Sequence, residues 1–274
     1  MTLQPSPSGP GAAQRFDLAF MLIKRDILGR YRGSAMGLFW AFLVPLLMLS
    51  IYTFVFGGIF QARWSERGIN GGAPDTLDFA LLLFIGLMAH SLLTESLIRS
   101  SSIIISNTNF VKRVVFPLDI LPLMTVLSAL FHFFISFTVF LLFFFAVKHT
   151  LHPGILWLPL ILLPFVVMTT GFCWFVAAAG VYYRDVAQLM GLGSTVLMFL
   201  SPVLYPASMI PAELLPLFHL NPLTFVIEQS RAVVFYGLSP DWQGLGLYTA
   251  IAIGVALVGY WAFSAMRKGF ADVL

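Results

Sequence analysis

The side chains that carry out most chemistry are few in this sequence, and they are scattered along it. The single cysteine, Cys173, lies in an apolar run and excludes an intrachain disulfide. The phosphate-binding pattern G-x-x-x-x-G-K-[ST] is absent, so the sequence offers no ATP site of that kind. No pair among the histidines has the spacing of a helical metal site; they are His90, His132, His149, His152 and His219. We therefore expect no catalytic residue, no metal and no cofactor on this chain.

The acidic residues beside the apolar runs favour a structural role over proton movement. Glu95 precedes Arg99 by four residues, which is the order and spacing of an ion pair within one helix. Asp119 and Asp185 stand at the ends of apolar runs, where water can reach them. No series of carboxylates lies inside these runs and no inverted repeat is visible, so a transporter driven by protons or sodium ions is disfavoured. The roles of Glu95 and of the histidines stay open.

The segment Ser100–Pro117 is of mixed polarity. Ser106 and Asn107 are suitable caps for a short helix, about 107–115, which must end before Pro117. Such a helix is too polar to cross a membrane and is suited to contact a soluble partner. A plain connecting loop fits the same residues. The side chains that would make the contact are Asn107, Asn109, Phe110, Lys112 and Arg113.

The segment 206–243 is the longest that lies between apolar runs. It contains five prolines, yet Leu214–Leu223 and Phe225–Phe235 are largely apolar. Runs of about 10–14 residues are too short to span a bilayer and are typical of re-entrant or interfacial segments. We expect two half-helices here, with Glu228 and Arg231 close enough on the second to pair.

Composition indicates the class of protein that must position these residues. The chain has 274 residues, of which 59% are hydrophobic and 10% are charged, and its mean hydropathy is +0.92. An average soluble domain is about 25% charged, so a soluble enzyme and a disordered protein are both excluded. The apolar runs are continuous rather than alternating, which excludes a membrane β-barrel. The expected fold class is an all-α polytopic membrane protein.

Six apolar runs are long enough to span a membrane, for which about 20 residues are needed. They are 35–60, 77–97, 119–147, 154–181, 186–205 and 244–266, within a transmembrane domain of 34–274. Residues 1–14 form a flexible cytoplasmic tail, and 15–33 an amphipathic helix. We expect this helix to lie in the membrane interface, with packing on the protein itself as the alternative. Its apolar stripe consists of Phe16, Phe20, Ile23, Ile27 and Tyr31.

The basic residues indicate the orientation of the six expected spans. Eleven lysines and arginines lie on the side of the N-terminal segment, and four lie on the other side. Basic residues are enriched in cytoplasmic loops, so we expect both termini in the cytoplasm.

Four motifs follow one another between Arg25 and Gly237. The first, Arg25–Trp40, reads RDILGRYRGSAMGLFW and is similar to the motif R-D-x-x-x-R-Y-x-x-S-x-L-G-x-x-W, with Met36 in place of Leu. The others are NFVKR followed by FP and ILP in Asn109–Pro122, Arg184-Asp185 followed by SPV and YP, and LNP with Arg231 and Gly237. Together they resemble the membrane subunit of type-2 ABC exporters that move lipid-linked polysaccharides: O antigens, teichoic acids and capsules.

The resemblance implies two copies of this chain and two ABC ATPase subunits, which bind ATP and magnesium, in the bacterial inner membrane. It implies export of an undecaprenyl-linked glycan, with lipid but no nucleic acid as a partner. The 107–115 helix would be the coupling helix seated in the ATPase, with Arg184 and Asp185 at a second cytoplasmic turn. Alternatively, Arg184 is only a topology signal. The segment 206–243 would form a periplasmic gate, with Asn221, Pro222, Glu228 and Arg231.

The resemblance also implies a channel between the two chains, lined by the first and fifth spans. On the first span one face repeats at helical spacing, and the fifth span adds aromatic residues. The expected channel-lining residues are Trp40, Leu43, Leu47, Ile51, Phe54, Phe199 and Tyr205. A face that contacts lipid or another helix is the alternative.

Three other functions are considered for the chain. A drug or lipid exporter of the same superfamily usually has a large external domain, whereas the expected first external loop, Gln61–Thr76, is short. A membrane-embedded glycosyl or lipid transferase would need convergent carboxylates or a metal site, and the sequence shows neither. A structural membrane scaffold is the third.

Overall fold

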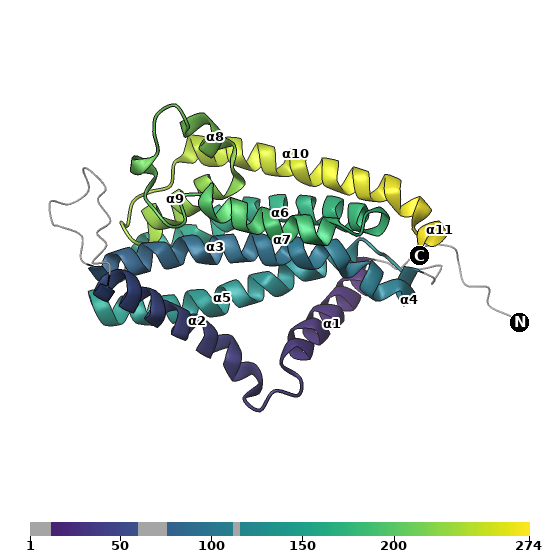
Figure 1. Ribbon diagram of the computed structural model, residues 1–274, viewed down its shortest axis with the longest axis horizontal. Helices are drawn as coiled ribbons and strands as arrows, with labels where there is room; N and C mark the ends of the chain where they lie inside the picture. Colours follow the sequence, from purple (N-terminus) through teal and green to yellow (C-terminus); the bar gives the residue numbers. More distant parts are fainter. Residues whose placement is uncertain (1–11, 60–75, 112–115) are drawn as a thin grey trace, which may run out of the picture.

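The computed structural model describes residues 12–59, 76–111 and 116–274, and every regular element in these ranges is a helix (Figure 1). In chain order the elements are α1 (Ala12–Tyr31), η1 (Gly37–Phe39), α2 (Trp40–Tyr52), η2 (Thr53–Ile59), α3 (Thr76–Ile103), η3 (Ile105–Asn107), α4 (Thr108–Val111), α5 (Ile120–Lys148), η4 (Pro153–Trp157), α6 (Leu158–Tyr182), α7 (Val186–Phe199), η5 (Ala207–Met209), α8 (Leu215–Leu220), α9 (Pro222–Val234), α10 (Trp242–Met266), η6 (Arg267–Gly269) and α11 (Phe270–Val273).

Five helical stretches in the described ranges are long and apolar enough to cross a membrane. They are Gly37–Phe56, Leu77–Ile103, Ile120–Lys148, Pro153–Tyr182 and Trp242–Val273. The expected class, an all-α polytopic membrane protein, is therefore confirmed. The fifth run expected from the sequence, 186–205, is helical only as α7, which has 14 residues and is short of a full crossing. The total of six spans stays a prediction.

The first expected span is irregular at both of its ends. It begins as the 3-10 helix η1, continues as α2 and ends in η2, a π-helix of seven residues. Pro45 lies inside α2, where its ring removes one backbone donor from the helical ladder. Three helical geometries in succession make this span less regular than the uninterrupted apolar run predicts.

The helix α3 is the centre of the bundle, and α2 lies at its edge (Figure 1). Each span has a most apolar window of 18 residues. In the span of α3, 83% of that window is buried, whereas in the span that contains α2 only 11% is buried. On the other side of the bundle, α6 and α10 approach closely. A Cβ atom on Gly259 would lie 2.1 Å from the carbonyl oxygen of Gly171, so only glycine permits this contact.

The two ends of the bundle are built differently. At one end α1, α4 and α11 gather around the ends of α3, α5 and α6 in an apolar cluster that includes Leu22, Ile104 and Phe270 (Figure 1). At the other end α8 and α9 close the bundle. There the Lys148 ammonium lies 2.5 Å from the Asp78 carboxylate, which links the end of α5 to the start of α3.

The amphipathic helix α1 is partly packed against the bundle and partly exposed. Leu22 is buried, and Ile23 packs against the same apolar cluster. In contrast, Phe16 and Phe20 are 72% and 61% exposed. The stripe is therefore divided between the protein and the surroundings, and the lipid-interface role of the exposed part stays a prediction.

Candidate functional site

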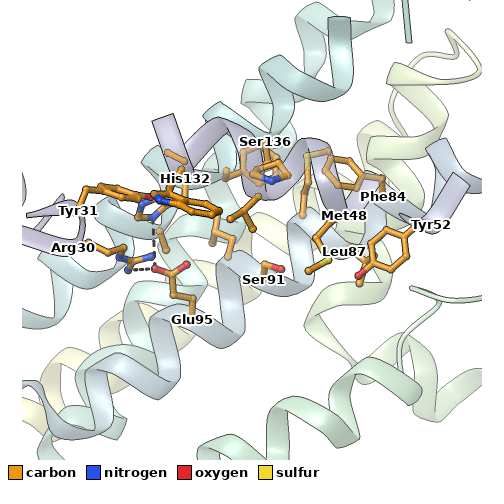
Figure 2. A pocket seen from close by; sticks show the side chains of 18 residues that line it. Arg30, Tyr31, Met48, Tyr52, Phe84, Leu87, Ser91, Glu95, His132 and Ser136 are labelled. Carbon is orange, nitrogen blue, oxygen red and sulfur yellow. Dashed lines mark hydrogen bonds and ion pairs between the residues drawn. The ribbon is translucent and has the colours of Figure 1, made fainter. Parts of the chain in front are cut away.

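A cleft of about 420 Å³ lies between α2, α3 and α5, beside the end of α1. Most of its lining is apolar: Val44 and Met48 from α2, Phe84 and Leu87 from α3, and Phe133 from α5. Its charged lining residues, Arg30 and Glu95, lie together with His132 and Tyr31 at one end, where α1 meets the bundle (Figure 2). The cleft is within the range of about 300–1,000 Å³ that is usual for small-molecule sites, which are mostly apolar with a few polar groups.

The polar end of the cleft is an ion-pair network that joins α1 to α3. Arg30 of α1 donates a short hydrogen bond to Glu95 of α3. One helical turn away, the Arg99 guanidinium lies 2.5 Å from the Asp26 carboxylate. Arg99 is also 3.7 Å from Glu95, as the sequence spacing predicted. On each helix the acidic and the basic residue are four positions apart and therefore lie on the same face. Where α1 and α3 meet, each acidic residue pairs with the basic residue of the other helix.

This network was not predicted from the sequence, where only the pair within one helix, Glu95 and Arg99, was recognised. The signal was nonetheless present. Asp26 and Arg30 are four residues apart, and so are Glu95 and Arg99, with the acidic residue first in both pairs. If two such helices are in contact, the acidic residue of each helix is predicted to pair with the basic residue of the other. The contact itself could not be predicted from spacing.

His132 of α5 completes the polar end of the cleft. Its Nδ1 atom lies 3.6 Å from Glu95, and its ring meets the Tyr31 ring edge-on at 6.0 Å between centroids (Figure 2). Both ring nitrogens are buried and have no hydrogen-bond partner among the described residues. Burial raises the pKa of the Tyr31 phenol, so its hydroxyl remains a donor at neutral pH.

The expected coupling helix is described only in part. Helix α4 begins at Thr108 and is described to Val111, whereas Lys112 and Arg113 lie outside the described residues. Asn109 is exposed. Ser106 and Asn107, expected to cap this helix, donate to the carbonyl of Ile103 and so bind the preceding helix α3.

Phe110 is half-buried between two neighbours. The Phe110 ring stacks on the Phe116 ring, with 4.3 Å between their centroids. The guanidinium of Arg25, on α1, lies 5.8 Å from the centroid of the Phe110 ring. Phe110 therefore links the short helix to α1 and to the start of α5. The second expected coupling site, Arg184 and Asp185, is an exposed turn between α6 and α7.

The expected channel-lining residues do not share one environment. Trp40 lines the cleft. Leu47, Ile51 and Phe54 are 46–67% exposed, and Leu43 is half-buried. The cleft uses the neighbouring face of α2, which sequence reasoning did not select.

On α7 and in the segment that follows it, the expected residues Phe199 and Tyr205 lie close together. Phe199 is 59% exposed. Tyr205 is half-buried, and its hydroxyl donates to the Phe199 carbonyl. No residue of α7 is fully buried.

Arg231, expected at the gate, is fixed inside the protein. It is 2% exposed, and its guanidinium donates to the carbonyl oxygens of Leu82, Pro202 and Val203 at 3.0, 2.6 and 3.0 Å. One side chain of α9 therefore binds both α3 and the segment after α7.

Asn221 and Pro222 begin α9, and Glu228 lies half-buried along it. The side-chain oxygen Oδ1 of Asn221 accepts from the Leu223 amide as an N-cap, while Nδ2 of the same side chain donates to the Leu200 carbonyl oxygen and the Ser201 hydroxyl. The half-helices expected at Leu214–Leu223 and Phe225–Phe235 are present as α8 and α9. Their function as a gate stays a prediction.

The helical bundle with five stretches long and apolar enough to cross a membrane defines a polytopic all-α membrane protein. Residues 17–235 match the family of ABC-2 type transporters, and the chain belongs to that family. It is a transport subunit of a type-2 ABC exporter, in which a separate subunit hydrolyses ATP.

The chain is also similar to curated relatives over nearly its whole length. Two proteins of Klebsiella pneumoniae, each named O-antigen export system permease protein RfbA, are 26% identical over 262 residues and 27% identical over 263. Each alignment covers 94% of this chain and 95% of the relative. A protein of the same name from Myxococcus xanthus is 25% identical over 257 residues, covering 93% and 94%.

Proposed function

We propose that this chain is the membrane subunit of an exporter for a lipid-linked, O-antigen-like polysaccharide. The observation that carries the proposal is the similarity to O-antigen export permeases across 94% of the chain. The resemblance of the four motifs supports it independently. The glycan is linked to undecaprenyl and crosses the bacterial inner membrane, with both termini of the chain in the cytoplasm.

The channel forms between two copies of the chain, and two ATPase subunits, which bind ATP and magnesium, drive it. The exposure of α7 and of the α2 face with Leu47, Ile51 and Phe54 supports this arrangement, because each copy leaves these surfaces uncovered. Aromatic and aliphatic faces suit a moving glycan, since they offer weak repeated contacts, whereas charge-assisted hydrogen bonds are about twice as strong and would retain it.

The ATPase contacts the end of the bundle where α1, α4 and α11 gather. Phe110 supports this role because it joins α4 to α1 and to the start of α5, so a force on α4 reaches two further helices. The exposed turn with Arg184 and Asp185 supplies a second contact. At the opposite end α8 and α9, fixed by Asn221 and Arg231, act as the outer gate.

To test the proposal, the chromosomal gene for this chain is deleted in the native cell, and the chain is then supplied from a plasmid. We expect surface polysaccharide to be lost on deletion, with lipid-linked glycan accumulating inside, and to return with the plasmid. Affinity purification of the plasmid copy should also recover an ATPase. Normal surface polysaccharide in the deletion strain, or accumulation of a different lipid or drug, would show that the proposed substrate is wrong.

A further inference from the structure

The cleft between α2, α3 and α5 has the shape and the chemistry of a site for an amphiphile. Most of its lining side chains are apolar, among them Phe84, Met48 and Leu87, and its charged residues are confined to the end near α1 (Figure 2). A molecule that fits this distribution has one apolar chain and one polar head. In a protein that spans a bilayer, the surrounding lipid is the most abundant source of such molecules.

The charges at the polar end identify the kind of head group. Arg30 and Glu95 line the cleft with one positive and one negative charge, and the Arg99–Asp26 pair next to them, outside the lining, is balanced as well, so the fixed charges cancel. A head group with a net negative charge gains little from a balanced site. A zwitterionic head group, with its phosphate toward an arginine and its ammonium toward a carboxylate, meets a complementary charge at each end.

The atoms needed for this recognition are available at the site. Within the described residues Glu95 makes its polar contacts through Oε1, so Oε2 can accept from an ammonium group. The two ring nitrogens of His132 are buried without a hydrogen-bond partner among the same residues, although Nδ1 lies 3.6 Å from Glu95 and buried polar atoms are nearly always satisfied. A phosphate oxygen that accepts from Arg30 and from one ring N–H of His132 would satisfy that nitrogen.

The position of α2 gives such a molecule a structural role. Within the described part of the chain this helix is poorly covered, and only Ala41 and Leu49 of it are buried. Val44 and Met48 form the α2 side of the cleft, opposite Leu87 of α3. A chain lying in the cleft would fill the space between these side chains and hold α2 against the bundle through dispersion contacts.

We propose that the cleft binds one phospholipid with a zwitterionic phosphoethanolamine head group, its head at Arg30, Glu95 and His132 and one acyl chain along α2. The proposal does not depend on which substrate the exporter carries.

Photolabelling of the full chain in vesicles tests the proposal. The vesicles contain equal amounts of phosphatidylethanolamine and phosphatidylglycerol, with a trace of one or the other carrying a diazirine on its acyl chain. We expect the ethanolamine probe to mark Met48 and Leu87 about fivefold more than the glycerol probe does, the ratio that about 1 kcal/mol of selective interaction gives. Leu257 of α10, which is 65% exposed, should be marked equally by both probes.

Two variants separate filling of the cleft from recognition of the head group. Ser91→Trp places a large side chain in the cleft without removing an ion pair, and should abolish labelling of Met48. Its matched control is Thr138→Trp, on an exposed position of α5 outside the lining, which should leave that labelling unchanged. Glu95→Gln should keep the labelling and lose the preference for ethanolamine, because the carboxylate that meets the ammonium is gone.

Three results would each overturn the proposal. Equal marking of the cleft by both probes would show ordinary surrounding lipid, and preference for the glycerol probe would show an anionic ligand. Absence of marking by either probe, together with a disulfide between two copies of Met48→Cys in the Cys173→Ala background, would show that protein fills the cleft.

Discussion

The Arg231 side chain holds three parts of the molecule together, and its removal should lower stability strongly. The guanidinium is 2% exposed and donates to carbonyl oxygens of Leu82, Pro202 and Val203. A hydrogen bond to a charged group contributes about 1.5–3 kcal/mol. In Arg231→Ala, water that enters the space left by the side chain can donate hydrogen bonds to the three carbonyl oxygens and so recovers part of this free energy. We therefore expect a loss of about 4 kcal/mol, somewhat below the sum for three such hydrogen bonds.

That loss corresponds to a decrease in Tm of about 8–16 °C for a chain of this size. The assay is thermal unfolding in detergent, followed by the fraction of chain that elutes as a monodisperse peak. Arg231→Lys should lose about half as much, because one ammonium cannot reach three carbonyls in the geometry of a planar guanidinium. The matched control is Arg184→Ala, an exposed arginine, which should shift Tm by no more than about 1–2 °C. An Arg231→Ala protein as stable as that control would refute the reasoning.

Three further predictions concern transport. Phe110→Asp puts a charge between Phe116 and the Arg25 guanidinium, and should uncouple export from ATP hydrolysis; normal export with normal recovery of the ATPase would contradict this. Arg184→Ala should reduce export while Arg184→Lys retains more of it, and full export by both variants would reduce Arg184 to a topology signal. In the Cys173→Ala background, Leu47→Cys and Ile51→Cys should react with a water-soluble thiol reagent during ATP turnover and be protected by the glycan; failure of both, while the opposite face of α2 reacts, would remove that face from the channel.

The class of protein and most of its helices could be predicted because hydropathy in a membrane protein is a strong and local signal. The runs expected at 77–97 and 244–266 lie within α3 and α10, the run expected at 119–147 matches α5 to within one residue, and the two half-helices near Pro222 were located to within a few residues. The left-handed conformation of His149, which closes α5, has no comparable signal in the sequence, because glycine is the usual residue at such a cap.

The candidate site could not be predicted because it depends on which helices meet. The α2 face was chosen by its regular spacing, yet every face of an apolar helix shows regular spacing. Only packing separates Val44 and Met48, which line the cleft, from Leu47 beside them. Arg231 was assigned to a gate from the resemblance of the LNP motif and the residues that follow it. The carbonyl oxygens that bind it have no signature in the sequence.

The slight burial of α2 has a consequence for how the protein is made. This helix precedes the other long apolar helices in the chain, so it leaves the ribosome first, yet it buries the least of itself against them. A newly inserted chain therefore carries a loosely held segment until a lipid or another subunit covers it. Such a segment is open to membrane proteases, whose action follows the population of the exposed form. The cellular amount of this subunit should then follow the supply of its assembly partners more closely than its own rate of synthesis.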